Sequence, residues 1–215
     1  MHVDDDLIIG TDKVFDTVVA ELRRRFNYGK WQTDNAPGES FVHCGRRVTR
    51  GEDWSVHLDM QSYIESVLPI ELSAKRKQQM NEKVTQHERS QLWSKVPQLA
   101  WVMRGDNPYI SFRVATLQQR AHDVDLTVES VKEYNSILAD ARRKPPTHVF
   151  HPIPLRDAVV IAVGDASLGN VGKTKTRSKG GSVTLIGEAS MATEGAEGRV
   201  SVVHWRSHRI KRVVR

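Results

Sequence analysis

Residues 158–167 read Ala-Val-Val-Ile-Ala-Val-Gly-Asp-Ala-Ser, an apolar run that ends in a glycine and a single carboxylate. Six apolar residues in succession favour a strand that is buried on both faces. Two more strand-like segments follow, over 182–186 and 199–205, with glycine- and lysine-rich turns between them. The chain after Pro146 is therefore expected to form a sheet, with Asp165 near its centre and close to the end of a buried strand.

Upstream of that sheet the apolar residues follow a helical period. Pro145-Pro146 ends this part of the chain and is expected to mark a boundary, because proline does not continue a helix. The spacing over 88–142 predicts two or three helices, the first with a kink or a late start at Pro97. The N-terminal part predicts a helix over 12–26, strands over 40–45 and 54–58 paired as a hairpin through the polar residues 46–53, a short helix over 59–68 and a polar stretch over 73–87. Together these segments predict an α+β fold.

Composition excludes several classes of protein. The chain has 215 residues, of which 39% are hydrophobic and 27% charged, as is typical of a soluble protein long enough to bury a core. Cys44 is the only cysteine, which excludes an internal disulfide and a thiolate metal cluster. No stretch approaches the ~18 apolar residues of a membrane span, and acids stand where a secretory signal would have lysines. We expect an intracellular protein without a membrane partner, in the cytoplasm or the nucleus.

Positive charge is concentrated near the C-terminus. The net charge is +6, and residues 173–215 carry ten Lys or Arg against three Glu. Such a tract, interleaved with Ser, Thr and Trp205, is of the kind that contacts phosphates without reading bases. A solvated surface is the alternative, because short basic runs are common. The candidate nucleic-acid-binding residues are Lys173, Lys175, Arg177, Lys179, Arg206, Arg209, Lys211 and Arg212.

Three carboxylates are candidate metal ligands. Asp4 and Asp5 stand next to an apolar run, and in a tight turn both side chains could approach one divalent cation. Their alternative role is to be solvated or to cap the following helix. Asp165 follows a predicted buried strand, a position where α/β sites often place metal ligands, and its alternative is a turn residue. Ser-nucleophile, phosphate-loop and dinucleotide-binding motifs are absent from the sequence.

The order of these segments resembles that of a known family. Val3-Asp4-Asp5 before an apolar run, the helix ending in Phe26 and the hairpin over 41–46 resemble the catalytic Y-V-D-D hairpin and following elements of copia-type retrotransposon reverse transcriptases. Residues 54–58 with 61–64 resemble the strand and helix after the palm of these enzymes. Residues 92–103 with 107–112 resemble their helical T-R-P-D-I region, with the Arg and Asp of that motif replaced.

The resemblance continues into the tethered ribonuclease H of that family. Residues 163–167 resemble the start of this domain, S-D-A-D-W, with Ser167 in place of the second Asp. Residues 175–181 are similar to its K-S-T-S-G turn, and residues 203–209 to its I-S-W-x-S-K-K-Q strand. His2 replaces the Tyr of Y-V-D-D. A third palm Asp would precede Met1 and the next nuclease acid would follow Arg215, so we expect an internal fragment of a polyprotein or a decayed element.

This resemblance implies a fold and a function. It implies a partial palm hairpin over 1–58, a helical thumb and connection over 59–146, and an incomplete ribonuclease H-like sheet over 147–215. In the whole enzyme, an RNA-directed DNA polymerase, Asp4 and Asp5 would help to bind two Mg²⁺ or Mn²⁺ ions that activate the primer 3′-hydroxyl, and Asp165 would be the first carboxylate of the nuclease site.

The implied partners are an RNA/DNA template-primer and the missing polyprotein segments. This fragment is expected to be inactive alone. A non-catalytic nucleic-acid-binding remnant of a decayed element is the alternative.

Overall fold

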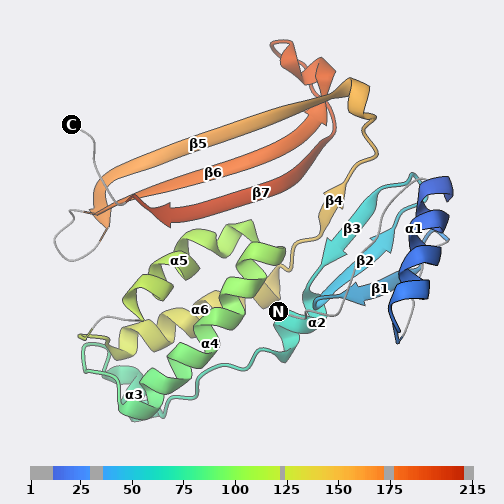
Figure 1. The fold of residues 1–215 in the computed structure, drawn as a ribbon. Coiled ribbons are helices and arrows are strands. Elements are labelled where there is room, and N and C mark those ends of the chain that lie inside the picture. The colour runs from blue at the N-terminus through green and yellow to red at the C-terminus, as the bar shows by residue number, and fades with distance from the viewer. Residues whose placement is uncertain (1–11, 30–35, 122–123, 172–176, 211–215) are drawn as a thin grey trace.

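The computed structural model describes residues 12–29, 36–121, 124–171 and 177–210, and it confirms a mixed α+β architecture with antiparallel sheets (Figure 1). A four-stranded sheet, a helical block and a long three-stranded sheet follow one another along the chain. No helix in the described parts of the chain is both long enough and apolar enough to cross a membrane. The elements are α1 (Asp12–Arg25), β1 (Ser40–His43), β2 (Arg46–Arg50), β3 (Val56–Asp59), α2 (Gln61–Ser66), α3 (Ala74–Gln78), α4 (Gln86–Gly105), η1 (Pro108–Ile110), α5 (Ser111–Arg120), α6 (Val128–Arg143), β4 (His148–Phe150), η2 (Leu155–Asp157), β5 (Ala158–Val171), β6 (Arg177–Glu188), η3 (Ala189–Ala192) and β7 (Val200–Arg209).

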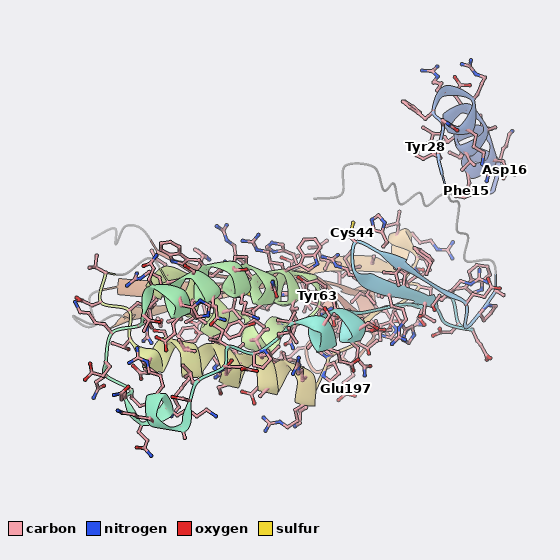
Figure 2. The ribbon with its side chains drawn as sticks, turned by 90° about the horizontal axis from the view of Figure 1, so that it is seen from below. Phe15, Asp16, Tyr28, Cys44, Tyr63 and Glu197 are labelled. Atoms are coloured by element: carbon pink, nitrogen blue, oxygen red, sulfur yellow. The ribbon has the colours of Figure 1, made fainter. Side chains whose placement is uncertain are left out.

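Helix α1 matches the helix expected over 12–26 to within one residue. Figure 2 shows it, with Phe15 and Asp16, set apart from the body of the molecule that carries Tyr63. Its apolar side chains Val14 and Val18 are accordingly exposed.

The first sheet has the strand order β1-β2-β3-β4, and all its pairs are antiparallel. The predicted hairpin between 40–45 and 54–58 was wrong, because β2 lies between these two strands in the segment expected to be a loop. Cys44 and Gly45 form the turn with φ values of 49° and 76°, the positive values that two-residue hairpin turns require. β2 was not predicted because three of its five residues are arginines, and a run of charged residues suggests a loop. The long stems of arginines can nevertheless cover a sheet while their charged ends reach polar partners. Arg47, for example, forms an ion pair with Asp59 on β3.

The helical block holds the hydrophobic core. Thr85 caps α4 in a capping box with Glu88, so this helix begins well before Pro97. Of the two alternatives expected at Pro97, the late start was wrong and the kink stays a prediction. The segment 73–87, expected to be only polar, contains α3 and the start of α4. Fully buried side chains of α4, α5 and α6 form the core, among them Leu92, Leu99, Val102, Val114, Leu117, Val131, Tyr134, Ile137 and Leu138.

The second sheet has the strand order β5-β6-β7 and lies over α5 (Figure 1). The sheet expected after Pro146 is confirmed, and Asp165 belongs to it. β5 is an edge strand that continues to Val171, however, so the predictions that Asp165 lies near the centre of the sheet and close to the end of a buried strand were wrong. Gly164 does not end the strand, because an antiparallel partner continues beside it through Ser182 and Gly181. The run over 158–163 is also not buried on both faces, since Val160 and Val163 are exposed.

Trp205 of β7 contacts both α4 and β4. Its indole Nε1 donates to the carbonyl oxygen of Met103 at 2.7 Å, and its ring stacks on His148 of β4 with the centroids 4.8 Å apart. The backbone N–H of His151 donates to the Ser201 hydroxyl at 2.8 Å. The division of the chain into regions 1–58, 59–146 and 147–215 stays a prediction. The structure shows in addition that β4, which follows Pro146, pairs with β3 of the first region.

Candidate functional site

The predicted site residues fall into two groups. Those outside the described residues are Asp4, Asp5, Lys173, Lys175, Lys211 and Arg212. The structure places the others, Asp165, Arg177, Lys179, Arg206 and Arg209, on the three-stranded sheet. The geometry around Asp165 therefore decides what the described part of the site can do.

The strand register creates a hollow next to Asp165. Asp165 lies opposite Gly181, and Gly181 lies opposite Ser207, so these three positions form one row across the sheet. Side chains alternate between the two faces of a strand, and all three positions belong to one face. Because Gly181 has no side chain, the surface is open between Asp165 and Ser207.

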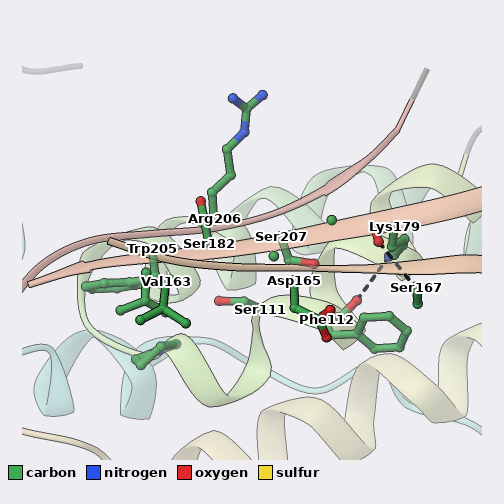
Figure 3. A pocket seen from close by; sticks show the side chains of 14 residues that line it. Ser111, Phe112, Val163, Asp165, Ser167, Lys179, Ser182, Trp205, Arg206 and Ser207 are labelled. Carbon is green, nitrogen blue, oxygen red and sulfur yellow. Dashed lines mark hydrogen bonds between the residues drawn. The ribbon is translucent and has the colours of Figure 1, made fainter. Parts of the chain in front are cut away.

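The helical block covers this hollow from the other side. Figure 3 shows Asp165 on the side of the sheet that faces Ser111 and Phe112 of α5. The cavity has a volume of about 490 Å³, and Val163, Val183 and Trp205 line it in the row next to Asp165. The lining thus combines apolar side chains with serines and charged groups.

Lys179 lies at one end of the cavity and is only 3% exposed. Its ammonium group donates to the carbonyl oxygen of Phe112 at 3.3 Å and to the Thr116 hydroxyl, and it lies 4.5 Å from the centroid of the Phe112 ring. Burial, with a smaller contribution from Arg120, lowers the pKa of Lys179 to about 8. Within the described parts of the chain no ion pair joins Lys179 to a carboxylate. Its charge therefore faces the cavity, and it is not on the exposed phosphate-binding surface that the sequence suggested.

The other basic residues of the sheet occupy different positions. Arg206 lies opposite Ser182, the residue that follows Gly181 on β6, so its side chain belongs to the other face of the sheet. Figure 3 shows its guanidinium pointing away from the helices. Arg209 lies opposite Lys179, and Arg177 begins β6. Lys179 and Arg206 thus stand on opposite faces.

Ser111 is a site residue that sequence reasoning missed. Its side chain is 7% exposed and lines the cavity, and its Oγ has no hydrogen-bond partner. A buried polar atom without a partner costs about 1–3 kcal/mol. A ligand that bonds to this hydroxyl would recover part of that cost.

The residues around Asp165 do not fit a divalent-cation site. Among the residues that the structure describes, no three His, Cys, Asp or Glu side chains gather at one point. Asp165 Oδ1 accepts a hydrogen bond from the N–H of Ala166 at 2.7 Å, and the same-face neighbours on β5 are Val163 and Ser167, neither of which is a carboxylate. Mg²⁺ and Mn²⁺ sites need several oxygen ligands. We therefore derive no metal-dependent step from this part of the chain.

A second polar cluster lies where the two sheets and α4 meet. Asp106 is fully buried, and its Oδ2 accepts from the N–H of Met60 at 3.3 Å. Its Oδ1 has no hydrogen-bond partner and lies 3.7 Å from Nε2 of His148. Burial raises the pKa of Asp106 to about 7, and burial also lowers the pKa of His148. The sequence offers no signal for this cluster, because Asp106 and His148 are brought together only by the fold.

A third polar group, on the first sheet, has the residue types of a hydrolase but not their order. The Ser55 hydroxyl donates to Asp53 and lies 2.9 Å from Nε2 of His57. In a serine hydrolase the His lies between the Ser and the Asp, whereas here the Ser lies between them and is buried. Gly51 makes room for this network, because a Cβ there would lie 2.4 Å from Ser55 Oγ. The group stabilises the turn before β3.

Comparison with known proteins adds no assignment, since no family model, no curated protein and no solved structure matched the chain.

Proposed function

We propose that this chain is part of a copia-type RNA-directed DNA polymerase with a tethered ribonuclease H, and that by itself it binds nucleic acid without turnover. The observation that carries this proposal is the position of Asp165 on the first of three consecutive antiparallel strands, after a helical block. The same order of segments underlies the sequence resemblance. Asp165 faces a cavity that also holds the buried ammonium of Lys179.

The lack of turnover follows from the carboxylates. Metal-dependent cleavage or synthesis of a phosphodiester requires carboxylates that hold two ions about 3.5–4 Å apart. Asp165 is the only carboxylate among the described residues that line its cavity, and Ser167 occupies the place of the second Asp of the family motif. The chain can attract a phosphate backbone through exposed arginines such as Arg206, a contact that needs no metal.

The second candidate function is that of a binding remnant from a decayed element. The same missing carboxylates favour it. The two candidates differ in the nucleotide sequence around the coding region, where an in-frame palm Asp upstream and a nuclease acid downstream are expected for an active polyprotein. Stop codons at both places would favour the remnant.

A polymerase assay tests the absence of turnover. The chain is incubated with a primed RNA template, deoxynucleotides and Mg²⁺ or Mn²⁺, and we expect no primer extension above background. Incorporation that disappears in Asp5→Asn would contradict the proposal, because it would require a complete two-metal site.

A binding assay tests the nucleic-acid surface. Fluorescence anisotropy of a labelled RNA–DNA hybrid is measured across a salt series, and affinity should fall steeply with salt, with a log–log slope of about −0.9 for each phosphate contact, the value for B-DNA. Arg206→Gln should reduce this slope by about one contact. Lys132→Gln, which removes an exposed charge from α6, is the matched control and should leave the slope unchanged. No binding at low salt, or equal effects of both variants, would refute the sheet as a binding surface.

A further inference from the structure

We propose that the cavity over Gly181 binds a single unpaired guanine base, with the Asp165 carboxylate accepting hydrogen bonds from its N1–H and amino groups and the Lys179 ammonium donating to its O6. This inference rests on the proposed function, since it names the part of a nucleic acid that enters the cavity.

The shape of the cavity comes from Gly181. A Cβ at this position would meet only the backbone oxygen of Arg206, at 3.9 Å, so the space within 4 Å of that position is otherwise open. Gly181 also lacks the positive φ that would require glycine for backbone reasons. The glycine thus leaves a flat, open floor on which a planar ring can lie between Asp165 and Ser207.

The charges around this floor select the ligand. Asp165 lies directly opposite Gly181, and Lys179 lies two residues before Gly181 on the same face, so a carboxylate and an ammonium group flank the floor from adjacent rows. Lys179 uses two of its three N–H groups on Phe112 and Thr116, which leaves one for a ligand. The ligand therefore needs hydrogen-bond donors on the part of its edge that faces Asp165 and an acceptor next to them that faces Lys179.

Guanine is the base whose pairing edge has this pattern. Its N1–H and amino group are adjacent donors that suit both oxygens of a carboxylate, and its O6 is an acceptor next to them. Adenine and cytosine place an acceptor nitrogen beside one amino group, and uracil places carbonyl oxygens on both sides of one N–H. Each of these would direct an acceptor at Asp165.

The walls and the remaining polar group also suit a base. Phe112 and Trp205 stand at the two ends of the cavity, and aromatic and apolar side chains hold bases taken out of a helix. The unpartnered hydroxyl of Ser111 is buried in the wall and can donate to a ring nitrogen. The base must be unpaired, because in a duplex its edge is already bonded to cytosine.

The test compares nucleotides and two valine variants. Isothermal titration calorimetry of the full chain should show that GMP binds at least about tenfold more tightly than AMP, CMP or UMP, the discrimination typical of a bidentate contact. Gly181→Val fills the cavity and should abolish this preference. Gly164→Val places the same side chain on the other face of the sheet, where the nearest atom would be 3.7 Å away, and should preserve it. Thermal unfolding of both variants checks that they fold.

Binding of oligonucleotides shows whether the base comes from a nucleic acid or from a free nucleotide. It also distinguishes failure of this inference from failure of the proposed function. A single-stranded oligothymidine with one guanine should bind more tightly than one without, and Asp165→Asn should remove the difference. A preference for GMP without a preference for the guanine-containing strand would overturn nucleic acid as the source. Equal binding of the four nucleotides, or a guanine preference that survives Gly181→Val, would overturn the inference and leave salt-dependent hybrid binding intact. Loss of hybrid binding as well would refute the proposed function itself.

Discussion

Replacing Asp106 by asparagine tests the electrostatics of the junction between the two sheets and α4. The fold raises the pKa of this carboxyl from 3.8 to about 7, mainly through burial, while the Asp59 carboxylate acts in the same direction and Arg46 opposes it. At about 1.36 kcal/mol for each pKa unit, ionised Asp106 costs the folded state up to about 4 kcal/mol. Asparagine keeps the shape of the side chain and cannot ionise.

The direction of the pH dependence follows from proton binding. Below the unfolded-state pKa of 3.8, Asp106 is protonated in both states and costs nothing. Between that value and about 7 the folded state binds more protons than the unfolded state, so the free energy of unfolding falls as the pH rises. We expect Asp106→Asn to match the wild type near about pH 4 and to exceed its stability by up to about 4 kcal/mol near about pH 8.

Urea unfolding followed by circular dichroism at several pH values measures this difference. His148 titrates in the same range with the opposite sign, because its lowered folded-state pKa makes stability fall as the pH drops below its ordinary value of 6.5. Burial is the largest cause of that lowered pKa and is kept in Asp106→Asn, so this contribution is largely common to both proteins and their difference reports chiefly on Asp106. Asp125→Asn, at an exposed surface pair with Lys83, should change stability by less than about 1 kcal/mol throughout. A difference that does not grow with pH would refute the reasoning.

Two other substitutions test the helical block by the same unfolding assay. Leu99 is fully buried in the core, so Leu99→Ala should lower the free energy of unfolding by about 2–5 kcal/mol, and a loss below about 1 kcal/mol would mean that α4 does not pack as described. The Arg76 guanidinium lowers the pKa of Glu88 from 4.5 to about 2. At pH values above the unfolded-state pKa, this carboxylate therefore contributes up to about 3 kcal/mol to the free energy of unfolding, and that contribution is lost as the pH falls toward 2. Glu88→Gln should therefore be less stable than the wild type at neutral pH and equal to it near about pH 2, whereas an equal loss at both pH values would exclude the ion pair as the cause.

Elements with one repeating apolar face could be predicted from the sequence. Leu92 and Leu99 stand seven residues apart, which is a helical spacing, and both are buried in the core. β2 could not be predicted in the same way, because counting arginines as polar hides their ability to cover a sheet. The end of β5 was misplaced because Gly164 and Asp165 suggest a turn locally, whereas β6 extends the strand as its partner.

In the candidate site, too, some residues could be identified from the sequence, whereas others are brought together only by the fold. Asp165 and Lys179 could be named from the sequence, since a carboxylate after an apolar run and a cluster of lysines stand out locally. Ser111 and Gly181 could not, because their shared cavity depends on the packing of α5 against the sheet. The burial of Lys179 depends on the same packing, which turned an expected surface charge into one that faces a cavity.

The pairing of β3 with β4 has a consequence for how the chain folds. Leu58 and His148 are partners in this pair, and the whole helical block lies between them in the sequence. Closing so long a loop carries a large entropic cost, whereas helices form from local contacts and form early. We therefore expect the first sheet to be completed only after α2 to α6 have folded back on themselves. During synthesis on the ribosome, the edge of β3 that pairs with β4 stays without its partner until β4 has emerged.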